Sequence, residues 1–242
     1  MGESYGRWTL GSDAALMRVV SSVNVACGFH AGDPTVIRQT VARALEHRLA
    51  VGAHPSFPDL QGFGRRHINC SPQEVFDLVL YQTGVLAAVT RALGGRLHHV
   101  KPHGALYNSA ARDSQLASAI ARAVRAIDQD LILYGLAGSR LIDEAEKIDL
   151  RAVSEVFADR TYQPDASLTP RSEPNALIKD VGKSVAQVLE MTTEQCVTAV
   201  NNKKIAIRAE TVCIHGDGAN ALEFATAIRQ KLQEKGITIE AL

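Results

Sequence analysis

Residues 98–108 are the most informative segment of the chain and read His98-His99-Val100-Lys101-Pro102-His103-Gly104-Ala105-Leu106-Tyr107-Asn108. We expect a short apolar strand to run into Lys101, because Pro102 lacks a backbone N–H and Gly104 permits an unusual turn. A lysine, a histidine, a tyrosine and an asparagine then lie at the end of the strand. Parallel α/β enzymes present their chemistry in this way, at the carboxyl ends of the strands.

The same pattern of a buried strand followed by a helix recurs along the whole chain. Strands are expected at residues 22–27, 49–53, 98–101, 131–136, 149–156 and 211–214, with a hairpin over residues 196–207. Helices are expected at residues 13–20, from Pro34, from the capping box Ser71-Pro72-Gln73-Glu74, and up to Gly236. No linker interrupts this order, so we predict one α/β domain over residues 1–242. Six or seven such units favour a closed or nearly closed (β/α) barrel over an open sheet.

Composition excludes several classes of protein. The 242 residues include 26 acidic and 26 basic side chains, so there is no electrostatic argument for nucleic acid or an anionic membrane as a partner. No continuous apolar run reaches the roughly 18–20 residues of a spanning helix, and no signal peptide is recognisable. The four cysteines form no C-x-x-C pair, which is typical of reduced thiols and predicts a cytoplasmic protein.

Reactive side chains lie at or just past the ends of the predicted strands. If the strands are parallel neighbours, one face of the sheet collects His30, His54, Lys101, His103, Glu155, Asp159, His215 and Asp217. A single histidine at a strand end is more often a hydrogen-bonded structural group, but four of them beside Gly or Pro favour catalysis. Two alternatives stay open. Glu155 and Asp159 could cap helices or pair with Arg160 and Arg171, and Lys101 could be a solvated surface charge.

Histidines together with carboxylates also fit a divalent metal site. The candidate ligands are His30, His54, His103 and His215. The chain has no H-E-x-x-H motif or other closely spaced ligand pair, so we rank metal binding below direct acid–base use of these residues.

Several long blocks of the sequence resemble the LamB/YcsF family, and together they cover nearly the whole chain. The blocks span residues 22–34, 52–56, 62–66, 101–108, 155–160 and 213–217, and include Cys27-Gly28-Phe29-His30-Ala31-Gly32-Asp33-Pro34 and Lys101-Pro102-His103-Gly104-Ala105-Leu106-Tyr107-Asn108. The resemblance implies an irregular (β/α) barrel of about seven strands, similar to the glycoside hydrolase/deacetylase group. It also implies ATP-dependent opening of the lactam of 5-oxoproline to L-glutamate, as in a 5-oxoprolinase that works with partner subunits B and C.

The chain departs from the family pattern in two places. Family members begin with Asp-Leu-Asn-x-Asp-Leu-Gly-Glu, whereas this chain begins Met1-Gly2-Glu3-Ser4, so we expect the first barrel strand to be missing. Ala166 stands where the family usually has glycine, and a positive φ there would strain the loop.

Opening an unactivated lactam with ATP suggests phosphorylation of the amide oxygen before water attacks. The predicted catalytic residues are His54, Lys101, His103, Glu155 and Asp159; the predicted substrate-binding residues are His30, Asp33, Arg66, Tyr107, Asn108, Arg160, Arg171, His215 and Asp217. Lys101, Arg160 and Arg171 would bind phosphate and carboxylate, and His103, His54 or Asp159 would be the base. No G-x-x-x-x-G-K-[ST] motif occurs, so ATP must bind by another geometry, here or on a partner.

Two other functions remain open at the level of sequence. The chain could be a metal-dependent deacetylase or amide hydrolase that acts alone, or a non-catalytic scaffold for its partner subunits. The sequence also leaves open whether copies of the chain form a homo-oligomer.

Overall fold

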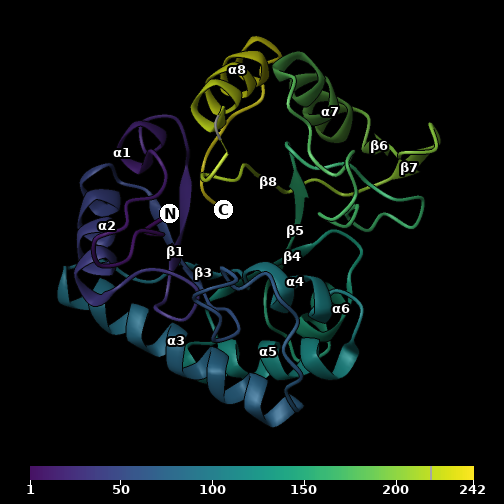
Figure 1. The fold of residues 1–242 in the computed structure, drawn as a ribbon. Coiled ribbons are helices and arrows are strands. Elements are labelled where there is room, and N and C mark those ends of the chain that lie inside the picture. Colours follow the sequence, from purple (N-terminus) through teal and green to yellow (C-terminus); the bar gives the residue numbers. More distant parts are fainter. Residues whose placement is uncertain (219) are drawn as a thin grey trace. The chain divides into compact units, whose positions relative to one another are not determined.

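The computed structural model describes residues 1–218 and 220–242 and contains two compact units (Figure 1). The first unit comprises Met1–Gly135 and Ser139–Ala152 with Ala241, and the second comprises Leu136–Gly138 and Val153–Glu240 with Leu242. The predicted α/β class and the alternation of strands and helices are confirmed. A single domain over residues 1–242 stays a prediction.

Four parallel strands form the sheet of the first unit. They lie side by side in the order β1 (Ser22–Ala26), β2 (Ala50–His54), β3 (His99–Val100) and β4 (Ile132–Leu136). The register places Ala26 opposite His54 and Ala53 opposite Val100, so these strands end close together. All residues of β4 are buried, as expected for a parallel strand covered on both faces.

The helices of the first unit are α1 (Asp13–Leu16), α2 (Pro34–Glu46), α3 (Pro72–Ala92), α4 (Gly104–Ala110), α5 (Ser114–Ile127) and α6 (Arg140–Glu146). Three of them, α1, α2 and α3, begin where the sequence signals predict. Asp33 caps α2 by accepting from two backbone N–H groups, and the capping box of Ser71 and Glu74 starts α3. Two details differ from the prediction: α1 is shorter than residues 13–20, and the short helix α4 follows β3 directly.

Helix α3 is long and apolar enough to cross a membrane, by length and composition alone. One such helix is weak support for a span, since the core helix of a soluble protein passes the same test. Helix α3 buries Val75, Val79 and Leu86 and packs against α5 and β2. The apolar residues Val75, Val79 and Leu86 are therefore accounted for by packing within the first unit, while Tyr81 and Val85 are exposed.

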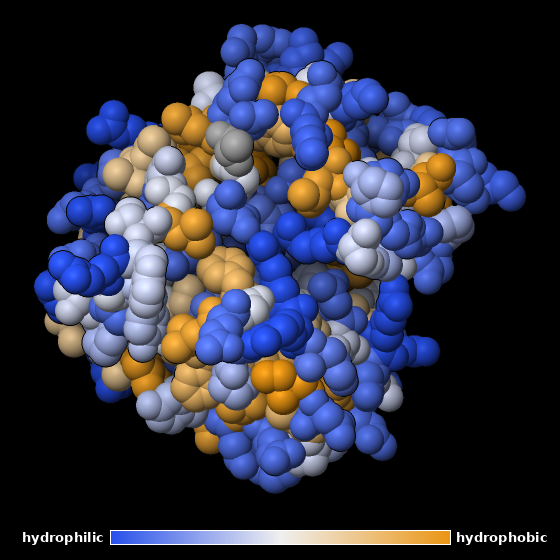
Figure 2. Space-filling model, in the orientation of Figure 1, coloured by the Kyte–Doolittle hydropathy of each residue, from blue (hydrophilic) through white to orange (hydrophobic). Residues whose placement is uncertain are grey.

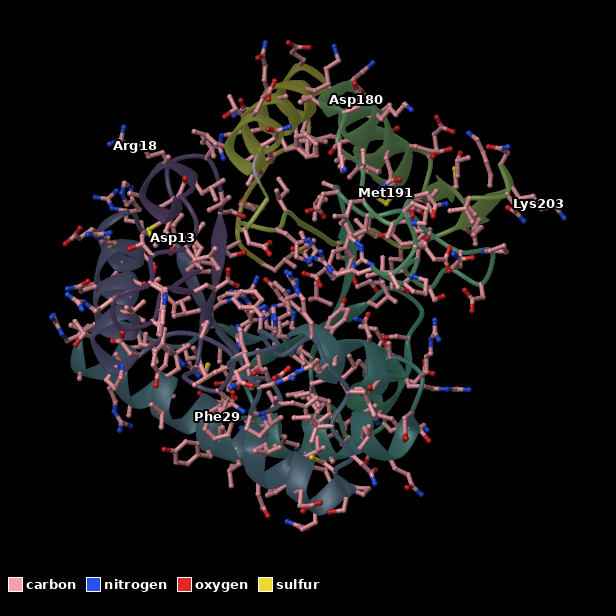
Figure 3. The ribbon with its side chains drawn as sticks, in the orientation of Figure 1. Asp13, Arg18, Phe29, Asp180, Met191 and Lys203 are labelled. Carbon is pink, nitrogen blue, oxygen red and sulfur yellow. The ribbon has the colours of Figure 1, made fainter. Side chains whose placement is uncertain are left out.

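The second unit pairs β5 (Ala152–Phe157) with β8 (Thr211–Cys213) in parallel, with Phe157 opposite Cys213. The predicted hairpin is confirmed as β6 (Cys196–Thr198) and β7 (Lys204–Ala206), with Lys203 at its tip (Figure 3). Helices α7 (Val181–Thr193) and α8 (Ala221–Glu234) complete the unit, and the outer surface of α8 is mostly hydrophilic (Figure 2).

Ala166 has a φ of 65°, so the strained backbone predicted for that loop is present. The described parallel ladders contain six strands, which agrees with the prediction of about seven strands without the first one.

Gly52 lies in the middle of β2, directly beneath the imidazole of His99. His99 is fully buried, its Nε2 lies 3.0 Å from Asn24 Oδ1, and its ring stacks on Tyr134 at 4.1 Å between centroids. A Cβ atom at residue 52 would overlap this ring. Strand β2 therefore requires a glycine here because a histidine occupies the space above it.

We predict that Gly52→Ala destabilises the protein by about 1–3 kcal/mol, the usual effect of overpacking a buried site that cannot yield. The control is Gly84→Ala in α3, where an added Cβ meets no atom within 4 Å and alanine favours the helix. The measurement is urea-induced unfolding of both variants and the wild type. Equal stability of Gly52→Ala and the wild type would contradict the packing described for His99.

Candidate functional site

The predicted site residues fall into two groups, one within each unit. His30, His54, Lys101, His103 and Tyr107 belong to the first unit, and Glu155, Asp159, Arg160, Arg171, His215 and Asp217 belong to the second. Within the first unit, three of the four predicted histidines contact one another. A common face for both groups stays a prediction.

The loop after β1 carries His30 and is fixed from two sides. Phe29 stacks on Tyr81 of α3 with 5.6 Å between ring centroids, and Figure 3 shows Phe29 beside that helix. The Phe29 carbonyl also accepts a hydrogen bond from the Asp59 backbone N–H. Gly28 and Gly32 both have positive φ, which lets the chain turn tightly at His30.

Ser56 connects His30 to helix α3. The Ser56 hydroxyl donates to the Phe57 carbonyl, so it accepts from His30 Nδ1–H at 2.9 Å. The Gln82 amide holds the Ser56 backbone with two hydrogen bonds of 2.9 Å, one to its N–H and one to its C=O. These contacts leave the proton of His30 on Nδ1 and a lone pair on Nε2. That Nε2 is buried and has no hydrogen-bond partner among the described residues.

His54 and His103 face each other across 3.0 Å, measured from His54 Nε2 to His103 Nδ1. The opposite nitrogen of each ring lies against a backbone carbonyl: His54 Nδ1 is 2.6 Å from the Lys101 oxygen, and His103 Nε2 is 2.8 Å from the Phe63 oxygen. A carbonyl oxygen only accepts, so these two nitrogens carry hydrogens. In the neutral rings, the nitrogens that face each other therefore both carry lone pairs.

The three histidines form one buried aromatic cluster. His30 lies flat on His103 with 3.9 Å between centroids, and His54 and Phe63 contact His103 edge-on. The exposed fractions are 1% for His30, 8% for His54 and 5% for His103. Burial, followed by the charge of His103, holds the pKa values of His30 and His54 well below the ordinary value of 6.5. These two imidazoles are therefore neutral at neutral pH.

Lys101 is buried beside this cluster. Its side chain is 4% exposed, which excludes the alternative of a solvated surface charge. Its ammonium lies 5.7 Å from the centre of the Tyr107 ring, within the range of a cation–π contact. A buried cation next to neutral bases can stabilise negative charge on a bound anion.

The loop after β2 closes over the cluster through an ion pair at its base. The buried Asp59 carboxylate accepts from the Arg66 guanidinium and from the Gly62 N–H, and these contacts lower the pKa of Asp59. Gly64 follows, and its carbonyl accepts from Ala105 N–H at 2.9 Å. Arg66 thus has a structural partner, and its predicted role in substrate binding stays a prediction.

Asp33 and Asn108 also have local partners. Asp33 caps α2 and accepts from Gly6 N–H at 2.8 Å, while exposed Asn108 donates to the Gly104 carbonyl at 3.0 Å. Substrate binding by these two residues likewise stays a prediction.

In the second unit, Asp159 and His215 form a carboxylate–imidazole pair. Asp159 accepts from His215 Nδ1–H at 2.9 Å and from the His215 backbone N–H at 3.1 Å. Burial raises the pKa of Asp159, but the charges and hydrogen bonds of His215 and the charge of Arg171 outweigh it, and the net shift is downward. Asp159 and Glu155 are the two carboxylates that the sequence predicts to be catalytic. Asp159 has a histidine as its hydrogen-bond partner, and Glu155 is buried within β5.

Arg160 is buried in the same unit and supports its loops. It donates to the backbone carbonyls of Thr169 and Ala176, at 2.6 and 3.2 Å. Burial and the charge of Arg171 lower the pKa of Arg160 to about 10. Asp217 is half-buried in the loop after β8. The predicted binding roles of Arg160, Arg171, His215 and Asp217 are not tested by these contacts.

Sequence reasoning missed four residues that build the first group: Glu3, Ser56, Asp59 and Gln82. Gln82 occupies an apolar position of α3, and a polar residue there is the one signal that could have revealed it. Gly2-Glu3 matches the Gly-Glu that ends the opening pattern of the family, and this is the signal that could have revealed Glu3. Its carboxylate and one ring nitrogen each of His54 and His103 lie within 4.8 Å of one another. These three residues could hold a metal ion.

Comparisons with known proteins cover the whole chain. The profile of the LamB/YcsF family matches residues 1–242. The chain is 58% identical over 241 residues to the 5-oxoprolinase A subunit of Bordetella parapertussis, covering 100% of this chain and 96% of that protein. It is 57% identical to the 5-oxoprolinase A subunit of Tolumonas auensis, with the same coverage of both chains. A crystal structure of a lactam utilization protein from Thermus thermophilus has a TM-score of 0.94 and 47% identity, covering 100% of this chain and 97% of that one.

We predict that stability falls as the pH decreases from 7.0 to 5.5. Burial lowers the pKa values of His30, His54 and His99 in the folded protein. As the pH falls through about 6.5, these side chains are protonated in the unfolded chain and stay neutral in the folded one, which favours unfolding. Three such groups remove about 3–4 kcal/mol of the unfolding free energy over this range. Carboxylates titrate at lower pH and contribute little here.

The measurement is urea-induced unfolding at several pH values. His99→Gln should reduce the pH dependence by about a third, whereas exposed His47→Gln should leave it unchanged. A flat stability profile between pH 7.0 and 5.5 would show that these imidazoles are not held neutral.

Proposed function

Because the chain belongs to the LamB/YcsF family, we propose that it is the A subunit of a 5-oxoprolinase, which hydrolyses the lactam of 5-oxo-L-proline to L-glutamate together with ATP hydrolysis. The observation that carries the proposal is the likeness over the full length of the chain to proteins of that name, at 57–58% identity. The lactam named in the description of the Thermus thermophilus protein is consistent with the same substrate class.

The chemistry follows from the poor reactivity of a lactam carbonyl. Transfer of the γ-phosphoryl group of ATP to the lactam oxygen makes the carbonyl carbon electrophilic and releases ADP. Water adds to that carbon, and the ring nitrogen leaves as an amine after it takes a proton. A second water then releases phosphate from the resulting acyl phosphate, which gives L-glutamate. The site must supply positive charge for phosphate, a base for water and an acid for nitrogen.

The first unit offers the cation and the base. The buried Lys101 ammonium is the group that would stabilise the phosphate and the developing oxyanion. His54 and His103 each present a lone pair on a ring whose other nitrogen is fixed by a carbonyl, and a ring whose lone pair holds no metal ion can accept a proton from water. His30 stacks on His103 and keeps that ring in place.

The second unit offers a second acid–base pair. An imidazole whose Nδ1–H points at a carboxylate, as His215 does towards Asp159, can carry a proton on its other nitrogen and deliver it to a leaving group. Glu155 is the remaining proposed catalytic carboxylate, and Arg171 the proposed partner for the substrate carboxylate.

The complex and the nucleotide complete the proposal. We assign ATP to a site shared with partner subunits B and C, since the sequence has no phosphate-binding loop of the common type. We assign the reaction to the cytoplasm, because ATP is available there and because the four cysteines of the chain are free thiols, as expected in a reducing compartment.

The decisive experiment measures L-glutamate and phosphate formed from 5-oxo-L-proline and ATP by this chain mixed with subunits B and C. We expect turnover with all three chains and none when this chain is omitted. Equal rates from B and C alone would make this chain a dispensable scaffold. Hydrolysis of acetylated sugars by this chain alone, with no activity on 5-oxoproline, would establish a deacetylase instead.

We predict that His103→Ala lowers turnover in the reconstituted complex by about 10²–10⁴-fold, the usual contribution of a positioned base. Lys101→Ala should abolish the ATP hydrolysis that depends on 5-oxoproline, because the cation beside the cluster is lost. The control is His47→Ala, since His47 is exposed at the end of α2. Circular dichroism and melting temperature check that each variant folds. Near-normal turnover in both variants would remove these residues from the mechanism.

A further inference from the structure

The facing nitrogens of His54 and His103 leave a position that only a positive species can fill. The carbonyls of Lys101 and Phe63 fix the hydrogens on the outer nitrogens, so two lone pairs meet across 3.0 Å. Two neutral imidazoles in this arrangement repel each other. A proton or a metal ion between the two nitrogens would remove this repulsion.

A shared proton is disfavoured by the surroundings. His54 and His103 are almost fully buried, and a charged ring that is buried without a counterion is costly. A shared proton would also leave a buried positive charge that needs an anionic side chain nearby to compensate it. Glu3 can supply that negative charge, because one carboxylate oxygen of Glu3 and one ring nitrogen each of His54 and His103 lie within 4.8 Å of one another.

We propose that Glu3, His54 and His103 bind one divalent metal ion within the first unit, with Zn²⁺ as the best match to one carboxylate and two imidazoles. Zinc–nitrogen bonds of about 2.0–2.1 Å in tetrahedral geometry place two ring nitrogens roughly 3.3 Å apart, close to the separation of His54 and His103. Three protein ligands leave one position open, which is typical of catalytic and not structural zinc sites.

The surroundings of the two histidines are those of metal ligands. Ligating histidines usually donate their second N–H to a carboxylate or a backbone carbonyl, which fixes the tautomer and the orientation of the ring. His54 and His103 both do so. The stacking of His30 on His103 restrains that ring further, but His30 is outside the group of three.

The backbone around Glu3 is held on both sides of the residue. The Met1 carbonyl accepts from Ala26 N–H at 3.0 Å, and the Ser4 carbonyl accepts from Gly32 N–H at 3.1 Å. Gly2 N–H donates to the Asp13 carboxylate at 2.7 Å. The segment thus lies beside the end of β1, and Ala26 of β1 is opposite His54 in the sheet. This register brings a carboxylate from residue 3 to a histidine at residue 54.

A second group of possible ligands, Glu190, Glu194 and Cys196 in the second unit, provides a contrast. The Lys204 ammonium already lies 3.3 Å from Glu190 and 2.6 Å from Glu194. A lysine therefore supplies the positive charge there, and this group serves as the control.

The test measures metal binding and not turnover, so its outcome is independent of the proposed function. The full-length protein is stripped with EDTA and titrated with ZnCl₂ by isothermal calorimetry at pH 7.5, and bound zinc is counted by elemental analysis after dialysis. We expect about one zinc per chain and a higher melting temperature with zinc. Glu3→Gln should weaken binding at least tenfold, while Glu194→Gln should bind as the wild type does.

Glu3→Gln is nearly isosteric at a half-buried position, and its melting temperature without zinc should equal that of the wild type. His103→Ala is the second variant and should also lose the zinc. Absence of zinc binding by the wild type would overturn the proposal, as would unchanged affinity in both variants. Loss of binding in Glu194→Gln alone would move the metal to the second unit and overturn it equally.

Discussion

The hydrogen bond from His54 Nδ1 to the Lys101 carbonyl, at 2.6 Å, is the contact on which the first unit's site depends. This hydrogen bond forms because the chain stays paired with β2 after β3 ends. Lys101 N–H donates to the Ala53 carbonyl, and His103 N–H donates to the Pro55 carbonyl. Pro102 lies between these two donors. In a parallel ladder, the N–H of this intervening residue points away from β2, so a proline here costs no hydrogen bond to β2. Proline therefore rigidifies the strand end without breaking the pairing that places His54 and His103 together.

Neutrality of the buried histidines is the second constraint. A buried imidazolium requires a compensating charge, and the described contacts of His30, His54 and His99 are to a hydroxyl, a carbonyl, an amide and other rings. The fold satisfies each donor with an acceptor and leaves the accepting nitrogens available. The Nε2 of His30, which has no hydrogen-bond partner in the described part of the chain, and the facing nitrogens of His54 and His103 are consequences of this arrangement.

The sequence predicts what depends on local signals. The strand at residues 22–27, the proline after Asp33 and the capping box at Ser71 each reappear within a residue or two in β1, α2 and α3. The histidines after β1, β2 and β3 could be predicted to meet because parallel strands end at one edge. Helix α4 was missed because its seven residues lack a cap side chain and a clear apolar period.

What could not be predicted depends on contacts distant in sequence. The link between Ser56 and Gln82 spans 26 residues and is invisible without the packing of α3 on the loop after β2. The proximity of Glu3 to His54 follows from the pairing of residues 1–4 beside β1. Tautomers are likewise set by carbonyl groups, since every residue has one and the sequence cannot show which one faces a ring.

The two histidine pairs differ in the acceptor that each fixed hydrogen faces. His215 directs Nδ1–H at the Asp159 carboxylate; burial raises the pKa of that carboxyl group, but the charge and hydrogen bonds of His215 outweigh burial and lower it. His54 directs Nδ1–H at a backbone carbonyl and faces a second imidazole, and burial followed by the charges of His103 and Lys101 lowers the pKa of its ring. A carboxylate thus orients the histidine of the second unit and a neutral carbonyl orients that of the first. The same type of side chain is held in two different electrostatic environments because the loops of each unit present a different acceptor to it.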